Sequence, residues 1–189
     1  MKNEQQGMKR DLLKGKNIWL RAVEPDDVDF IYSIENDPVI WHLGNTIVPF
    51  SRFQIEQYAL ASQHDIYADK QLRLMIELHL DTKVTKTIGA VDLYDFDPLH
   101  KRAGVGILII QEERERGFAD ESLGILIHYC FEVLLLHQLY CFISPGNTTS
   151  LHLFKKHGFV KCGLKKEWRL NEGKWTDEIM FQLINRHND

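Results

Sequence analysis

The stretch that decides the fold is GILIIQEERERGFA, residues 106–119. Its first half lies in the apolar run 103–110, which is typical of a strand buried on both faces. Its second half enters residues 117–136, where apolar side chains recur at helical spacing. The first N–H groups of a helix lack internal partners and can hold a phosphate, and Gly117 and Ala119 leave room for one. The junction therefore predicts an anion site, although an ordinary strand-to-helix turn would also fit these residues.

Strand and helix signals continue on both sides of this junction. On the N-terminal side, we expect a strand at 17–23, helices at 26–36 and 51–63, and a hairpin of strands at 71–80 and 87–96. On the C-terminal side, we expect a strand at 139–143, a helix between a cap at Asn147 and a left-handed end at Gly158, and closing strands at 159–170 and 174–184. The order predicts an α/β (α+β) fold.

Length, charge and cysteine usage narrow the class of protein. The chain has 189 residues, which fits a loose lead at 1–14 followed by one domain at 15–189. Its formal net charge of −4 argues against general nucleic-acid binding. We expect a cytoplasmic protein without a membrane partner, because no apolar run approaches the length of a bilayer span and the first 16 residues are polar. Three cysteines without a CxxC spacing and nine scattered histidines predict no metal site.

Two motifs together resemble the GNAT superfamily of N-acetyltransferases. The first is Arg114-x-x-Gly117-x-Ala119, and the second runs from Asn147 through Ser150 and Phe154 to the pair Gly158-Phe159. The likeness extends over residues 17–184 and is similar to the branch of ribosomal-protein N-terminal acetyltransferases and spermidine acetyltransferases. It implies a central mixed, mostly antiparallel sheet of six to seven strands, flanked by about four helices.

The resemblance also implies that acetyl-CoA is the cofactor and places it on particular residues. The diphosphate would bind backbone N–H groups of the loop that contains Arg114, Glu115, Arg116, Gly117, Phe118 and Ala119. The pantetheine arm would pair with the backbone of Leu108 and Ile109, and Asn147, Ser150 and Phe154 would complete the site. Glu115 stands where the family often has glycine, so it would bring a negative charge near the phosphates.

The usual catalytic side chains of the family are absent. Many members carry a tyrosine at the position of Phe154, which protonates the departing thiolate, and some carry a glutamate at the position of Phe142. An acceptor amine must lose its proton before it attacks, because alkylamines are mostly protonated at neutral pH. Without the usual acid, we expect catalysis to rest on positioning of the amine and on polarisation of the acetyl carbonyl by backbone N–H groups.

Asp92 is the best substitute base, since it lies in the apolar segment 88–93, where burial would raise its pKa. A structural hydrogen bond would explain it equally well. Tyr94 shares its strand face, and Ser144 shares a face with Phe142, so both are secondary candidates. His100 could shuttle protons from its loop or simply be solvated there.

The acceptor should bind near the first two helices, where acidic residues gather. The acidic residues are Glu24, Asp26, Asp27, Asp29, Glu35 and Asp37, with Tyr32, Trp41 and His42 nearby. They favour a cationic amine such as a polyamine, a protein N-terminus or an aminoglycoside, although a solvated helix face would have the same composition. Trp168 and Trp175 could line the acceptor site, form a contact in a homo-oligomer or pack in the core.

The leading hypothesis is an acetyl-CoA-dependent N-acetyltransferase in which a primary amine attacks directly in a ternary complex. The alternative is a non-catalytic acyl-CoA-binding protein of the same fold, which the phenylalanine at position 154 would permit.

Overall fold

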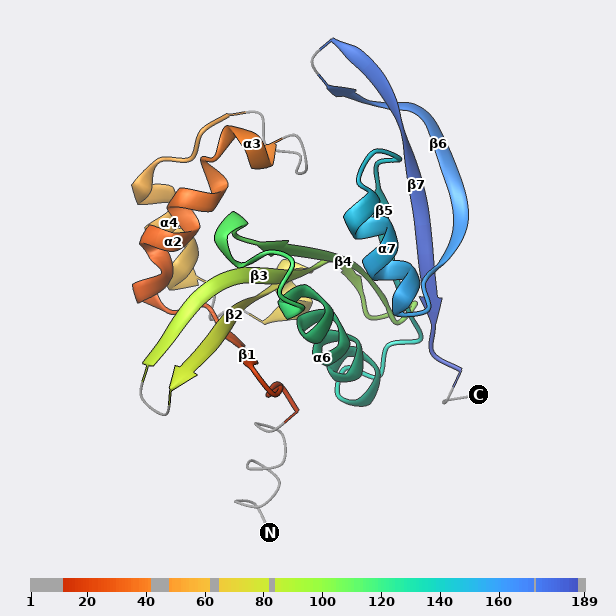
Figure 1. The fold of residues 1–189 in the computed structure, drawn as a ribbon. Helices are drawn as coiled ribbons and strands as arrows, with labels where there is room; N and C mark the ends of the chain where they lie inside the picture. The colour runs from red at the N-terminus through yellow and green to blue at the C-terminus, as the bar shows by residue number, and fades with distance from the viewer. Residues whose placement is uncertain (1–11, 42–47, 62–64, 82–83, 172, 187–189) are drawn as a thin grey trace.

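One seven-stranded sheet runs through the computed structural model, which describes residues 12–41, 48–61, 65–81, 84–171 and 173–186 (Figure 1). The strands are β1 (Ile18–Ala22), β2 (Leu72–Asp81), β3 (Val84–Asp97), β4 (Arg102–Ile109), β5 (Gln138–Ile143), β6 (Val160–Asn171) and β7 (Lys174–Ile184). Their order in the sheet is β1-β2-β3-β4-β5-β7-β6, and only the β4–β5 pair is parallel. The expected mixed, mostly antiparallel sheet is confirmed, with β4 at its centre.

Helices cover both faces of the sheet. The helices are α2 (Val28–Glu35), α3 (Pro38–Trp41), α4 (Arg52–Ala61), α5 (Ile66–Asp69), α6 (Phe118–Glu132) and α7 (Thr148–Lys156), with 3-10 turns η1 (Pro25–Asp27) and η2 (Gln111–Glu113). Helices α6 and α7 contribute to the larger hydrophobic cluster, and α2 and α4 contribute to a second cluster around Met75 and Ala90. Because Ala90 and Val91 are neighbours on β3 and belong to different clusters, the two helix pairs lie on opposite faces.

Local capping signals predicted helix starts better than helix ends. Ser51 and Gln54 form the expected reciprocal bonds, with N–H to oxygen distances of 3.2 and 2.8 Å. The α6 helix ends at Glu132 rather than at the expected Leu136, because Leu135 adopts a left-handed φ of 53°. The Leu136 N–H then bonds to the carbonyl of Cys130, six residues earlier, at 3.0 Å. No glycine marks this end in the sequence.

Strands β4 and β5 separate soon after they meet. Their register includes only three pairs, the last being Gly104 with Tyr140. Strand β4 then continues to Ile109, and β5 continues to Ile143, without further pairing between them. The sheet is therefore split between its two central parallel strands, and one edge of β4 is open along 105–109.

The closing hairpin of β6 and β7 extends beyond the neighbouring α7 (Figure 1). Trp168 and Trp175, on this hairpin, are 58% and 61% exposed, so the expectation that they pack in the core is wrong. One continuous sheet joins the N-terminal and C-terminal strands, which supports a single domain at 15–189. That domain boundary stays a prediction.

Candidate active site

The open edge of β4 presents the backbone of alternate residues. The Ile110 N–H donates to the Ile88 carbonyl at 3.0 Å, which fixes the phase of the antiparallel ladder between β3 and β4. Because N–H and C=O groups change sides at every residue, the ladder turns the backbone of Leu108 toward β3 and that of Ile107 and Ile109 toward the split. Of the two residues expected to meet the pantetheine arm, only Ile109 presents its backbone there.

The loop that follows β4 leads into the N-terminus of α6. Gly117 precedes α6 with a φ of 85°, and a side-chain carbon placed on it would meet nothing within 4 Å. Glu115 is exposed and has a φ of 61°, a left-handed conformation in which most L-residues are strained. The glycine therefore provides the expected clearance before the free N–H groups of Phe118 and Ala119, and the glutamate stands in a backbone position that suits glycine.

Three charged side chains stiffen this loop. The Glu113 carboxylate accepts a hydrogen bond from Lys86 Nζ at 2.7 Å and also binds Arg116, whose guanidinium lies 5.0 Å from the centre of the Phe118 ring. The bond from Lys86 holds the pKa of Glu113 below its usual range. Arg114 Nε donates to the Ile109 carbonyl at 3.0 Å, and Arg114 has no acidic partner among the described residues. Arg114 is thus the loop arginine whose charge is available to an anion.

The second motif forms the start of α7, as its sequence predicts. The Asn147 side chain accepts a hydrogen bond from the Ser150 N–H at 3.1 Å, and the Asn147 N–H bonds to the Ser144 carbonyl at 3.0 Å. Gly158 ends the helix region with a φ of 85°. Phe154 is only 3% exposed, and its ring meets that of Phe159 edge to face at 5.0 Å between centroids. Phe154 is a core residue in this arrangement.

A pocket of about 400 Å³ lies on the other face of the sheet, under α2 and α4. Its polar lining includes Glu35 of α2, Gln54 and Tyr58 of α4, Arg73 of β2, and Asp92 and Tyr94 of β3. Asp92 and Tyr94 are therefore brought together as the sequence predicts, whereas Ser144 does not line the pocket. His100 is exposed at the turn between β3 and β4, where its backbone N–H donates to the Asp97 carboxylate.

Arg73 joins two carboxylates inside this pocket. Its Nε and one terminal nitrogen donate to the two oxygens of Asp92 at 2.7 and 3.2 Å, and its other terminal nitrogen donates to Glu35 at 2.6 Å. Burial alone would lower the pKa of Arg73, but Asp92 and its other neighbours raise it overall, so the guanidinium is always charged. Asp92 is thus a bidentate ion-pair partner of Arg73, in keeping with the structural hydrogen bond that was the alternative to its role as a base.

Strand β4 lies between the pocket and the split in the sheet, and two of its residues on the pocket face are glycines. Gly104 and Gly106 of β4 pair with Tyr94 and Asp92, and neither glycine carries a side chain on the pocket face. A side-chain carbon on Gly104 would lie 2.1 Å from Cε2 and 2.4 Å from Cζ of Tyr94, so the tyrosine ring occupies that space. Tyr94 therefore lies over the last β4 residue that pairs with β5.

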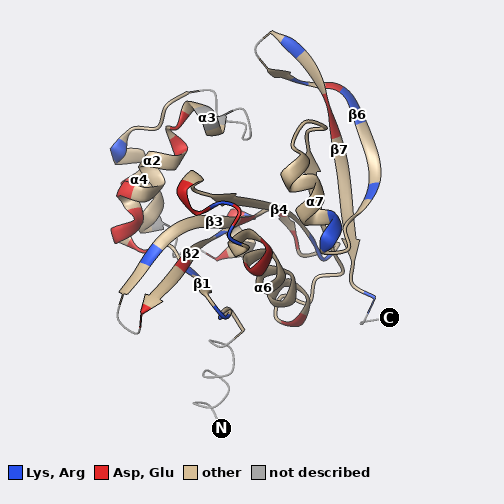
Figure 2. Ribbon diagram, in the orientation of Figure 1, with Lys and Arg blue, Asp and Glu red and all other residues tan. Residues whose placement is uncertain are grey.

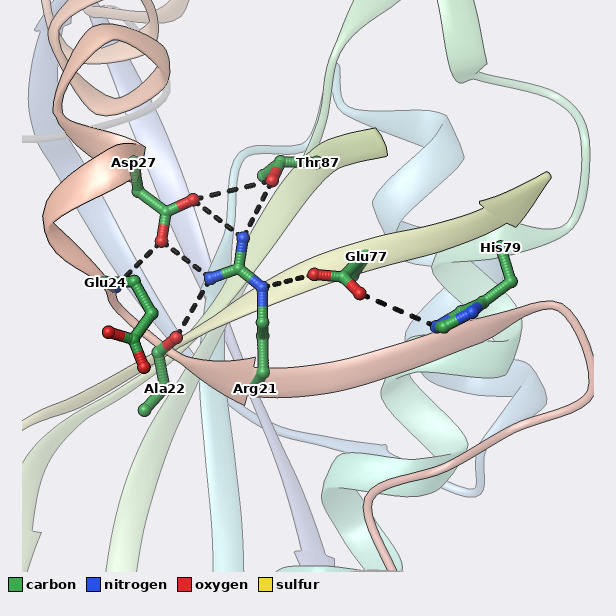
Figure 3. Close-up of polar contacts among 7 residues, drawn as sticks. All are labelled: Arg21, Ala22, Glu24, Asp27, Glu77, His79 and Thr87. Carbon is green, nitrogen blue, oxygen red and sulfur yellow. Dashed lines mark hydrogen bonds and ion pairs between the residues drawn. The ribbon is translucent and has the colours of Figure 1, made fainter. Parts of the chain in front are cut away.

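Only part of the expected acidic group reaches the pocket. Asp27 is 4% exposed and pairs with Arg21 at 2.6 and 2.8 Å, and Arg21 also binds Glu77 and Thr87 (Figure 3). Glu24, Asp26 and Asp29 are exposed, and of the expected acids only Glu35 lines the pocket. His42 lies outside the described residues, as does the side chain of Trp41. Figure 2 nevertheless shows acidic residues concentrated at α2 and the turn before it.

Comparison with known proteins identifies the family. Residues 17–160 match the family described as the acetyltransferase (GNAT) domain, which covers more than half of the chain. The chain belongs to the GNAT acetyltransferase family. It is 30% identical over 168 residues to the spermidine N(1)-acetyltransferase of Vibrio cholerae, covering 88% of this chain and 92% of that protein. The spermidine N(1)-acetyltransferase of Escherichia coli K12 is 26% identical over 169 residues, covering 89% and 86%.

Solved structures give the same result for the fold. The crystal structure of spermidine N-acetyltransferase from Vibrio cholerae in complex with CoA and spermine matches with a TM-score of 0.77 and 26% identity. The match covers 90% of this chain and 96% of that one. This GNAT protein is accordingly an N-acetyltransferase that uses acetyl-CoA. The expected fold, enzyme class and cofactor are confirmed.

The described residues of this GNAT protein also bear on membrane spanning and on metal binding. No described helix is long and apolar enough to cross a bilayer. The described residues contain no group of three or more histidine, cysteine, aspartate or glutamate side chains that could hold a metal ion.

Sequence reasoning missed Arg73 and the two glycines of β4. Arg73 had a partial signal, because the expected hairpin of 71–80 and 87–96 puts positions 73 and 92 on neighbouring strands without fixing their register. Gly104 and Gly106 had a weaker one, since alternating glycines in a buried strand mark close approach of another group. Lys86 and Glu113 had no local signal for their pairing across β3 and η2.

Proposed function

We propose that this GNAT protein transfers the acetyl group of acetyl-CoA to a primary amine of a small cationic acceptor, with a polyamine as the preferred class. The observation that carries this proposal is the pocket beside the split sheet, in which Glu35 and Asp92 flank Arg73. Two carboxylates against one guanidinium leave one net negative charge, which favours a cation. Similarity to spermidine acetyltransferases supports the same acceptor class.

We assign acetyl-CoA to the split between β4 and β5. The diphosphate would bind the N–H groups at Gly117, Phe118 and Ala119, with Arg114 supplying an unpaired charge. The pantetheine arm would follow the backbone of Ile109 and Ile107 toward Gly104, a path of about 16 Å at the usual rise of a strand.

At the second motif, Asn147 and Ser150 would border the coenzyme at the start of α7, and Phe154 would support the site from the core. The thioester would then reach the point where the strands separate, next to the pocket.

Direct attack follows from this placement. The amine would approach from the pocket, across the side-chain-free backbone of Gly106 and beside the Tyr94 ring that covers Gly104, and meet the thioester at the split. Asp92 is proposed to hold the cationic acceptor rather than to accept its proton, because Arg73 engages both of its oxygens. Ordered amine and thioester supply proximity, which is the main source of rate where strong acids and bases are absent.

The test is thiol release from acetyl-CoA with a panel of amines. We expect polyamines to be acetylated with higher kcat/KM than aminoglycosides or N-terminal peptides, and mass detection should show one added acetyl group. Release with none of these amines, in the presence of confirmed coenzyme binding, would favour the non-catalytic alternative. The dodecameric structure of the Vibrio cholerae enzyme supports a homo-oligomer here as well, which size-exclusion chromatography would test.

A further inference from the structure

Breakage of the thioester is assisted by a proton donor, and Phe154 of the second motif does not supply one. The C–S bond breaks with its electron pair on sulfur, so a nearby acid lowers the barrier. The ring of Phe154 is buried against Phe159 and has no exchangeable proton. Ser144 lies beyond the end of β5 and outside the pocket lining.

Tyr94 places a hydroxyl-bearing ring at the end of the split. Its Cζ, the carbon that bears the hydroxyl, lies 2.4 Å from where a side-chain carbon of Gly104 would stand. Gly104 pairs with Tyr94 on one side and with Tyr140 on the other, and its pair with Tyr140 is the last before β4 and β5 separate. The Tyr94 ring meets the Tyr140 ring edge to face at 5.8 Å between centroids. The Tyr94 ring therefore extends from β3 over β4 toward β5. It covers the point of the sheet at which the thioester is proposed to lie.

The hydroxyl of Tyr94 is available and protonated. It has no hydrogen-bond partner among the described residues, whereas the Tyr140 hydroxyl donates to Asp95 at 3.3 Å. Burial, with the added effects of Tyr140, Cys141, Asp95 and Glu178, raises the pKa of Tyr94 above that of an ordinary tyrosine. A phenol that keeps its proton at neutral pH can donate a hydrogen bond to the sulfur as charge develops there, and it cannot act as a base.

We propose that Tyr94 donates its proton to the sulfur that leaves when the amine attacks the thioester. The amine nitrogen forms the new C–N bond, the C–S bond breaks with its electron pair on sulfur, and the Tyr94 proton passes to that sulfur. The proton that the nitrogen loses returns to the phenolate oxygen through solvent, so amine and thioester become amide and thiol. This inference rests on the proposed function for the position of the thioester.

A binding experiment tests the contact without turnover. CoA and desulfo-CoA, which lacks the sulfur, are titrated by calorimetry into the full chain at pH 7 and at about pH 9.5, because a reference thiol ionises at a pKa of about 8.5. We expect wild type to prefer CoA by about tenfold at the higher pH, the size of one hydrogen bond to a charged group. Tyr94→Phe should abolish the preference and leave desulfo-CoA affinity unchanged. A preference that survives in Tyr94→Phe, or is absent in wild type, overturns the proposal.

The matched control is Tyr140→Phe, which removes a hydroxyl that bonds to Asp95 and should keep the sulfur preference. Tyr94→Phe should fold normally, since it keeps the ring that covers Gly104. With the best acceptor, Tyr94→Phe should lower kcat by about 10²-fold or more while the acceptor KM changes little. An unchanged kcat would overturn the proposal. If wild type acetylates no amine but still prefers CoA through Tyr94, the proposed function fails and the sulfur contact stands.

Discussion

Two arginines in this protein make nearly the same contacts in different surroundings. Arg21 of β1 binds Asp27 from η1 and Glu77 from β2, and Arg73 of β2 binds Glu35 from α2 and Asp92 from β3. Each arginine therefore ties a helical segment to a neighbouring strand.

The Arg21 group, drawn in Figure 3, lies outside the pocket lining. The Arg73 group instead forms the polar side of the pocket. The same ion-pair geometry can thus serve packing in one place and recognition in another.

The largest expected effect is the loss of folding stability when Arg21 is replaced. Arg21→Met leaves Asp27, which is 4% exposed, without its counter-ion, and removal of one partner of a buried pair costs about 3–5 kcal/mol. We expect about 3 kcal/mol less free energy of unfolding by chemical denaturation, since Arg21 itself is 29% exposed. The folded fraction should keep its kcat/KM. Arg52→Met, an exposed arginine paired with Asp29, is the control and should change stability little.

The same variant predicts a pH dependence. Burial would raise the pKa of Asp27, but Arg21, together with the hydrogen bonds from the Glu24 N–H and Thr87, holds it below the usual value of 3.8. A depressed pKa adds stability above the ordinary value, and this stability is lost as pH falls through the folded-state pKa. The stability gap between wild type and Arg21→Met should therefore be full at pH 7 and shrink below about pH 4. A gap that stays constant down to pH 3 would assign the loss to packing.

The second effect concerns recognition at Arg73. Asp92→Asn removes one of two negative charges from the pocket and should raise the KM for a cationic acceptor about tenfold, since a hydrogen bond to a charged group contributes about 1.5–3 kcal/mol. The shape of kcat/KM against pH should not change, because Arg73 occupies the oxygens of Asp92. A flattened acidic limb would instead make Asp92 the general base. Asp29→Asn, on the same helix as Glu35 but outside the pocket lining, is the control.

The contacts of Arg73 also show how much of the pocket the sequence can predict. The expected hairpin brings Arg73 and Asp92 onto neighbouring strands, but their exact register depends on two irregularities between β2 and β3 that the sequence does not mark. Glu35 reaches Arg73 from a helix 38 residues earlier in the chain, and that contact depends on how α2 packs against the sheet. Hydrophobic spacing predicts that a helix packs, not where it lies along the strands.

The coenzyme loop was more predictable than the pocket. Its conformation depends on interactions that are local in the sequence. Gly117 and Gly158 adopt positive φ values, and Asn147 caps the first turn of α7. Leu135 shows the limit, because a left-handed leucine ended α6 where a sequence pattern would require glycine. Tertiary burial of Leu136, which is 1% exposed, stabilises that end and has no local signal.

A third effect compares two glycines with the same backbone. Gly117 and Gly173 have φ values of 85° and 75°, and neither has an atom within 4 Å of a built side-chain carbon. Valine at either position should therefore cost a similar strain, roughly 1–2 kcal/mol of stability. Only Gly117→Val should weaken acetyl-CoA binding, by about tenfold in calorimetry, because its side chain would stand before the N–H groups of α6. Equal coenzyme affinity in both variants would place the phosphate site elsewhere.

The smallest effect compares two glutamates in left-handed conformations. Glu115 has a φ of 61° in the loop before α6, and Glu167 has a φ of 48° on the closing hairpin. Glycine at either position relieves roughly 1–2 kcal/mol of strain but costs about 0.5–1 kcal/mol of chain entropy, so both variants should gain at most about 1.5 kcal/mol of stability. Only Glu115→Gly also removes a negative charge beside the proposed diphosphate, which should tighten acetyl-CoA binding about two- to threefold at low salt. Because exposed charges are screened within about 10 Å at 0.1 M salt, that gain should shrink as salt is added. A salt-independent gain, or an equal gain in Glu167→Gly, would show that backbone relief and not charge sets the affinity.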